Sequence, residues 1–215
     1  GADLGLDLMA ELRVGQNHPG HKGAKRGRKT NHHHQKGDAQ HHEKRDEGRH
    51  LGQARSVDEI VVGDDSQSDT TLAIVLEMLE ASGIDLVIRR HRPGLGVRAN
   101  FSDAIAATTG DVVVLCDQDD LWEPDKVERL LEALDEVELV HTDATLIDAN
   151  GDPLGTTLLR ELRVTAWEQR NLEAGDALGV LLKRNLVTGA TAALRGDFAR
   201  GAMPVPEGWI HDEWL

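Results

Sequence analysis

The sequence predicts an α/β domain in which a mostly parallel β-sheet carries helices on both faces. Short β-branched runs alternate along the chain with stretches whose apolar positions recur at helical spacing. Strands that alternate with helices of roughly ten to fifteen residues form βαβ units, and such units build a parallel sheet that is covered on both sides. The chain of 215 residues has 39% hydrophobic content, which suits one domain with a sizeable core and an additional segment.

The first half of the domain follows this alternation closely. The β-branched run at residues 60–62 predicts a buried strand that ends in the polar loop 63–66. A helix is expected to begin near residue 70, because Asp69 or Thr70 can cap its start, and to stop at Ser82-Gly83. Residues 84–88 predict a second strand, and a Gly-rich turn leads from it into a helix at 97–107.

The second half begins with the most apolar strand in the chain, predicted at residues 112–115. A helix should begin near Pro124, which suits a first helical turn, and residue 139 should begin another strand. After Gly151 the pattern is weaker, with a helix expected near residues 174–183. These elements assign residues 51–215 to one α/β domain.

Residues 1–50 are predicted to be a disordered segment that is foreign to this domain. Between Gly15 and His50 the only apolar side chains besides one proline are two alanines, so little can offset the entropy lost on ordering. The segment holds eight of the eleven histidines, and these could bind zinc or nickel adventitiously. They lack the paired spacing of a structural metal site, so a physiological metal role is not favoured.

The charge is distributed unevenly along the chain. The formal net charge is -14, yet Lys and Arg outnumber Asp and Glu before residue 57, so the predicted domain is strongly acidic. An acidic domain argues against nucleic-acid binding. The single cysteine, Cys116, cannot form an intramolecular disulfide, and no apolar run reaches about 18 residues. We therefore expect a cytoplasmic protein with no integral membrane segment, attached to a membrane at most peripherally.

Acidic residues follow two of the predicted strands, at the edge where open α/β sheets bind their ligands. Asp64 and Asp65 follow the first strand, and Asp117, Asp119 and Asp120 follow the strand at 112–115. Crowded carboxylates repel one another, and a hard cation such as Mg²⁺ or Mn²⁺ shared with substrate phosphates would compensate them. Aspartates that merely cap the next helix would give the same pattern, and spacing alone leaves the two interpretations even.

Five segments form an ordered set of motifs. Residues 57–69, 96–101 and 117–122 read VDEIVVGDDSQSD, GVRANF and DQDDLW, and they are followed by TGAT at 188–191 and HDEW at 211–214. In this order the segments resemble the family 2 glycosyltransferases of the GT-A fold, and most closely the rhamnosyltransferase-like branch. The resemblance extends from Val57 to the end of the chain and is more specific than a lone DxD motif.

The resemblance implies a role for each acidic cluster. Asp64 and Asp65 would contact the base and ribose of a nucleotide-diphosphate sugar, while Asp117 and Asp119 would form the DxD pair that binds Mg²⁺ or Mn²⁺. Asp119 is the expected direct metal ligand. Arg98 would assist the phosphates, although an arginine on the polar face of a helix is more often simply solvated.

The later motifs imply the acceptor side of the site. Gly189 belongs to the expected sugar-side loop, and Asp212 would be the general base of an inverting transfer to a polysaccharide or lipid-linked acceptor. A surface carboxylate is the alternative for Asp212. His211 could tune Asp212 or merely pack, whereas His91 and His141 have no partner in sequence and are expected to be structural.

The chain also departs from the family pattern at both ends. Family members begin with a strand that carries a Thr-Tyr-Asn or Ala-Tyr-Asn motif, but this chain contains no tyrosine and similarity resumes only at residues 51–57, as a shifted reading frame would produce. They usually continue beyond the motif at 211–214. A second hypothesis is therefore a non-catalytic remnant that cannot bind the donor. A third is an N-terminal tail that binds metal or nucleic acid.

Overall fold

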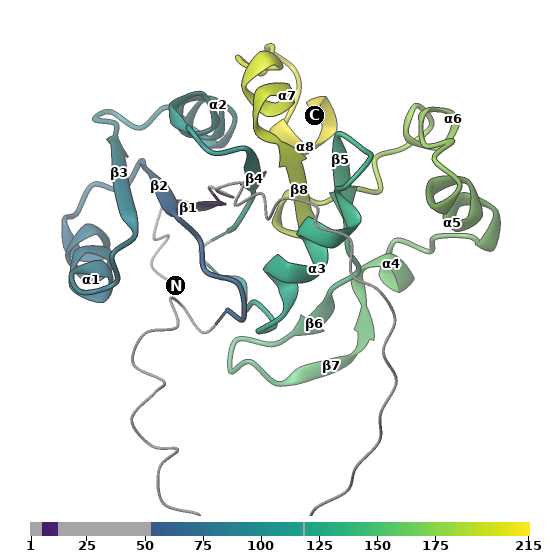
Figure 1. The fold of residues 1–215 in the computed structure, drawn as a ribbon, viewed down its shortest axis with the longest axis horizontal. Coiled ribbons are helices and arrows are strands. Elements are labelled where there is room, and N and C mark those ends of the chain that lie inside the picture. Colours follow the sequence, from purple (N-terminus) through teal and green to yellow (C-terminus); the bar gives the residue numbers. More distant parts are fainter. Residues whose placement is uncertain (1–5, 13–52, 118) are drawn as a thin grey trace, which may run out of the picture.

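The computed structural model describes residues 6–12, for which only the backbone is considered, together with residues 53–117 and 119–215. A six-stranded sheet with the strand order β3-β2-β1-β4-β8-β5 forms its centre (Figure 1). The strands of this sheet are β1 (Leu6–Leu12), β2 (Glu59–Asp64), β3 (Asp85–Arg90), β4 (Val112–Val114), β5 (Leu139–His141) and β8 (Ala192–Arg195).

Four of the six strands point in the same direction. Strands β2 and β3 pair in parallel, and β1 is antiparallel to both β2 and β4, so β2 and β4 share one direction. Strands β4 and β5 are both antiparallel to β8 and therefore also agree. The predicted α/β class is confirmed, but the sheet is mixed: β1 and β8 are reversed, so of the described strands only β2 and β3 pair in parallel.

Strand β1 was not expected, because the sequence predicts no ordered element before residue 51. It occupies the centre of the sheet, where Ala10 pairs with Ile60 of β2 on one side and with Val114 of β4 on the other. Without β1, the backbone groups of β2 and β4 that face each other would have no partner in the sheet. The predicted disorder of residues 13–50, with the histidines and lysines there, lies outside the described residues.

Helices cover both faces of the sheet. The larger ones are α1 (Thr70–Leu79), α2 (Val97–Ala107), α3 (Lys126–Ala133) and α5 (Ala166–Glu173). The short elements are α4 (Leu158–Glu161), α6 (Leu178–Leu181), the 3₁₀ turn η2 (Gly189–Thr191), α7 (Gly196–Gly201) and α8 (His211–Trp214). A separate hairpin joins β6 (Thr145–Ile147) to β7 (Pro153–Thr157). Within the described ranges, no helix is long and apolar enough to span a membrane.

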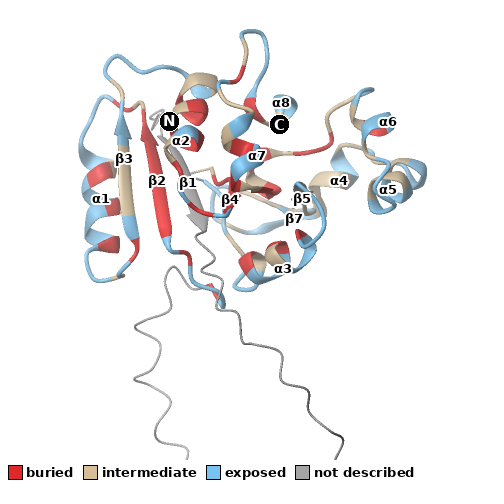
Figure 2. Ribbon diagram, turned by 45° about the horizontal axis from the view of Figure 1, so that its top comes forward, coloured by how far each residue is buried: buried red, intermediate tan, exposed pale blue. Residues whose placement is uncertain are grey.

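Alternate side chains of the central strands enter two cores. Ile60 and Val62 of β2 belong to the core under α1 and α3, whereas Val61 between them belongs to the core that contains Phe101 of α2. This alternation is the ordinary period of a β-strand, and here it buries both faces. Figure 2 shows β2 buried along its whole length.

The helix predicted near residues 174–183 is wrong in its bounds. Thr165 and Glu168 form a capping box that starts α5 earlier, at Ala166. Gly175 adopts a positive φ of 79°, a conformation that ends helices, and α6 begins only at Leu178. Two short helices therefore replace the single one expected.

Candidate functional site

The ends of β2 and β4 reach the same edge of the sheet. Ala10 pairs with both Ile60 and Val114, so these two residues lie at one height in neighbouring positions. Asp64 follows Ile60 by four positions and Asp117 follows Val114 by three. Since one strand separates β2 from β4, their ends are about 10 Å apart.

The turn η2 lies at this edge as well. The amide of Leu115, just after β4, donates to the carbonyl of Ala192 at 3.2 Å, so the start of β8 adjoins the end of β4. Residues 189–191 precede that start directly. The fold thus brings together the loops after β2 and β4 and the predicted sugar-side loop.

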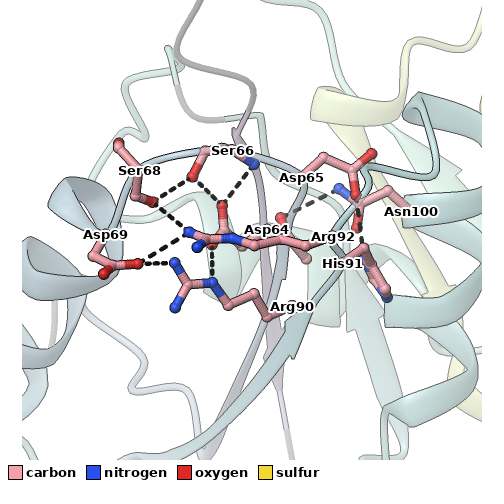
Figure 3. A network of polar contacts seen from close by, with 10 residues as sticks. Asp64, Asp65, Ser66, Ser68, Asp69, Arg90, His91, Arg92 and Asn100 are labelled. Carbon is pink, nitrogen blue, oxygen red and sulfur yellow. Dashed lines mark hydrogen bonds and ion pairs between the residues drawn. The ribbon is translucent and has the colours of Figure 1, made fainter.

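Asp64 is fully buried and holds the shape of its own loop. Its Oδ1 accepts hydrogen bonds from the amide of Ser66, at 2.9 Å, and from the Ser66 hydroxyl. Its Oδ2 lies 3.6 Å from Nε of Arg90, which also pairs with Asp69 (Figure 3). Because the carboxylate is fully buried, direct contact with a nucleotide would require Ser66 or Arg90 to move.

Asp65 is linked to a chain of charged groups through His91. Nδ1 of His91 lies 3.2 Å from Oδ1 of Asp65, and its Nε2 lies 2.9 Å from Oδ2 of Asp103 (Figure 3 shows the contact with Asp65). Two hydrogen bonds from Arg89, at 2.7 and 2.8 Å, hold the pKa of Asp103 below its ordinary value. The amide of Gly96 donates to Oδ2 of Asp65 at 2.6 Å. His91 is therefore not isolated, contrary to the sequence interpretation.

Asn100, in the motif GVRANF, links α2 to the end of β2. It is fully buried, and its Nδ2 donates to the carbonyl of Gly63 at 3.2 Å. A Cβ on Gly63 would lie 2.5 Å from Oδ1 of Asn100, so only glycine allows this approach. The sequence offered no signal for this contact beyond the motif itself.

The side chain of Arg98, in α2, is hydrogen-bonded to a residue near the C-terminal end of the chain. Its Nη1 donates to the carbonyl of Val205 at 2.8 Å. It lines a cavity of about 400 Å³ together with Ser102, Arg200 and Met203, between α2 and the α7 region. Arg98 is thus hydrogen-bonded to the segment after α7, and its role toward phosphates stays a prediction.

The loop after β4 is closed by a backbone hydrogen bond. The amide of Asp120 donates to the carbonyl of Asp117 at 3.3 Å, and Asp119 is exposed. Partial burial raises the pKa of Asp120, while the ammonium group of Lys126 opposes that rise. Gln118 lies outside the described residues.

The carboxylates of this loop suit a metal site that is completed by substrate phosphates and water. Among the residues that the structure describes, no three His, Cys, Asp or Glu side chains gather closely enough to hold a metal ion by themselves. Mg²⁺ is commonly bound by one or two carboxylates together with substrate phosphates and water. The carboxylates of Asp117 and Asp119 fit such a partial site.

The predicted base lies on α8, which packs against η2 and α2. The His211 ring stacks on Phe101, with centroids 3.7 Å apart and an interplanar angle of 7°. Burial lowers the pKa of His211, although the charge of Asp212 opposes this. A Cβ on Gly189 would lie 2.5 Å from Nε2 of His211, so glycine permits the close contact. Oδ1 of Asp212 is buried and has no hydrogen-bond partner within the described part of the chain.

Comparison with known proteins supports the resemblance to family 2 glycosyltransferases but not the finer rhamnosyltransferase-like branch. The family model described as "Glycosyl transferase family 2" matches residues 49–197. Over 104 residues the chain is 32% identical to an uncharacterized glycosyltransferase of Nostoc sp., a match that covers 46% of this chain and 31% of that protein. Uncharacterized proteins of Mycobacterium bovis and Mycobacterium tuberculosis are 32% identical over 80 residues, which is 36% of this chain and 22% of each relative. The matches thus span less than a third of these relatives. No solved structure matches the chain.

Proposed function

This chain belongs to glycosyl transferase family 2, and on that basis we propose that it transfers a sugar from a nucleotide-diphosphate donor to a saccharide or lipid-linked acceptor. The observation that supports this most is the meeting of four segments at one sheet edge: the loops after β2 and β4, the turn η2 and helix α8. Ligands of open α/β sheets bind at this edge. Rhamnose is the proposed sugar, on the strength of the motif resemblance alone.

The nucleotide would bind beside the loop after β2. Asp65 is the better placed of the two aspartates there, because its side chain retains 12% exposure whereas that of Asp64 has none. A carboxylate oxygen can accept more than one hydrogen bond. Asp65 can therefore accept a hydrogen bond from a ribose hydroxyl while its contacts with the Gly96 amide and the His91 ring remain. Asp64 would act mainly by holding the loop in shape.

Asp117 and Asp119 would hold Mg²⁺ or Mn²⁺ at the end of β4. When bound, the ion would neutralise charge that develops on the leaving diphosphate. The two carboxylates contribute oxygen ligands only, the set that these cations prefer. The negative charge of the loop also keeps the anionic diphosphate away unless a cation is present, which makes donor binding metal-dependent.

Asp212 would act as the general base. Its Oδ1 has no hydrogen-bond partner within the described residues but is buried, so an acceptor hydroxyl would reach it only after a local movement of α8. As that proton moves to the carboxylate, the acceptor oxygen bonds to the anomeric carbon and the bond from that carbon to the diphosphate breaks. Burial favours neutral His211, so the neighbouring ring does not neutralise the base.

A non-catalytic remnant remains the second candidate, and two observations favour it. The central strand β1 is antiparallel to both neighbours, and the Asp64 carboxylate is fully buried against Ser66 and Arg90. Either feature would impair a nucleotide site. Nucleotide binding therefore separates the two candidates.

The test is calorimetric titration of the folded chain with UDP and dTDP, with and without Mn²⁺. We expect Mn²⁺-dependent binding that Asp119→Ala abolishes. Asp135→Ala is the matched control, because Asp135 is also an exposed aspartate but precedes β5 and therefore lies toward the opposite edge of the sheet. Absence of binding to the folded wild-type chain would favour the remnant, and binding that survives Asp119→Ala would refute the assigned metal ligand.

A further inference from the structure

We propose that Lys126 is a positioning residue that ties the acidic loop 117–120 to the turn η2. Lys126 is the first residue of α3, and its Nζ donates to the carbonyl of Ala190 in η2 at 2.7 Å. The same ammonium group lies 4.0 Å from the ring centroid of Trp122, which follows the acidic loop. One cation thus contacts both η2 and Trp122, two residues beyond the acidic loop. This inference rests on the proposed function, because it concerns the loop to which metal binding is assigned.

The backbone at the start of α3, from which the Lys126 side chain extends, is held in place by hydrogen bonds. Gln53 is 3% exposed, and its Nε2 donates to the carbonyl of Glu123 at 2.9 Å while its Oε1 accepts from the amide of Val127 at 3.3 Å. The amide of Ala54 donates to the carbonyl of Pro124 at 2.6 Å. Residues on either side of Lys126 are therefore held by a separate segment, so its side chain extends from a fixed point.

A cation at this position is unfavourable unless the surroundings compensate it. The amino end of a helix carries partial positive charge, and Lys126 is partly buried there. The compensation comes from the carbonyl of Ala190, the indole face of Trp122 and the nearby carboxylates of Asp117 and Asp120. The attraction is mutual, so Lys126 also reduces repulsion within the acidic loop. The loop can then hold its carboxylates together before a metal ion arrives.

Replacing Lys126 should weaken metal-dependent binding in particular. Lys126→Met keeps the length of the side chain but removes the charge and the hydrogen bond. We expect the Mn²⁺-dependent affinity for UDP to fall about tenfold, while the affinity for uridine without metal stays unchanged. Lys126→Arg retains a cation and a donor and should restore most of the loss. Equal Mn²⁺-dependent UDP affinity in the wild type and Lys126→Met would overturn the proposal.

A second readout needs no nucleotide. Cys116 is the only cysteine and directly precedes the acidic loop, where it is 8% exposed and its Sγ donates to the carbonyl of Asp117 at 3.3 Å. If Lys126 restrains the loop, Lys126→Met should react with an aromatic disulfide reagent about tenfold faster at equal pH. Burial raises the pKa of Cys116 to about 12, and the Lys126 charge opposes this rise, so loss of the charge alone would slow the reaction. Acceleration therefore reports loop opening.

The two readouts keep the two proposals apart. A faster thiol reaction in Lys126→Met, with no UDP binding in the wild type, would refute the transferase but keep the positioning role. A slower thiol reaction in Lys126→Met, which loss of the charge alone predicts, would refute the positioning role whether or not UDP binds. Thermal unfolding confirms that each variant is folded, and Lys126→Gln, which keeps a donor for Ala190, replaces the methionine variant if that variant does not fold.

Discussion

The substitution Gly189→Ala tests whether η2 and α8 form one unit. The added Cβ would lie 2.5 Å from Nε2 of His211, well inside ordinary van der Waals contact. The His211 ring cannot turn aside easily, because it is buried and stacked on Phe101 at 3.7 Å. We therefore expect α8 to be displaced, and Asp212 with it.

The cost can be estimated from this geometry. Forcing one extra methyl group into a packed site costs about 1–3 kcal/mol. For a domain of this size, each kcal/mol lowers the unfolding temperature by about 2–4 °C, so a cost of about 2 kcal/mol predicts a decrease of about 4–8 °C. Sugar transfer should be lost, because Asp212 moves with α8.

The assay is thermal unfolding followed by tryptophan fluorescence. Gly201→Ala is the matched control, since no atom lies within 4 Å of a Cβ at that position, and it should shift the midpoint very little. A double-mutant cycle identifies the contact: if the clash with His211 causes the loss, Gly189→Ala should cost much less in a His211→Ala background. Equal costs in the two backgrounds would refute the reasoning.

Two further predictions concern pH. Hydrogen bonds from Arg184 and from the backbone of Thr165 lower the pKa of Glu168 from 4.5 to about 2. These bonds therefore stabilise the folded state fully above pH 4.5, and this contribution is lost as the pH falls toward 2. The difference in urea midpoint between wild type and Glu168→Gln should therefore shrink from pH 6 to pH 3, and a constant difference would contradict the assignment. Burial lowers the pKa of His141 below 6.5, so the unfolded chain takes up a proton first and stability falls as the pH drops below 6.5. The decrease between pH 8 and pH 5 should be smaller in His141→Gln; an equal decrease would show that His141 does not titrate in this way.

Part of the site could be predicted because it depends on local pattern. The β-branched run at 60–62 and the apolar strand at 112–115 mark two strand ends, and ligands of α/β sheets bind at such ends. Asp65 and Asp117 follow their strands as predicted, whereas Asp64 is the last residue of β2 rather than part of the loop after it. Their roles toward a nucleotide and a metal ion stay predictions.

Contacts between distant segments were not predicted. His91 touches Asp65 and Asp103, which lie on either side of it in sequence and belong to different elements. Lys126 contacts Ala190, 64 positions away. Neither spacing matches a helical or strand period, so no pattern in the sequence marks these pairs.

The sequence by itself determined the α/β class, the order of the helices and strands from residue 57 to residue 141, and the strand ends at which a ligand would bind, because side-chain periodicity and turn residues act over a few neighbouring positions. Only the tertiary structure decided that β1 lies antiparallel at the centre of the sheet. It also decided that the buried Asp64 carboxylate contacts Ser66 and Arg90, and that the His211 ring packs directly against Gly189. Strand partners and close contacts depend on which apolar surfaces the whole folded chain can bury against one another. No local stretch of residues contains that information.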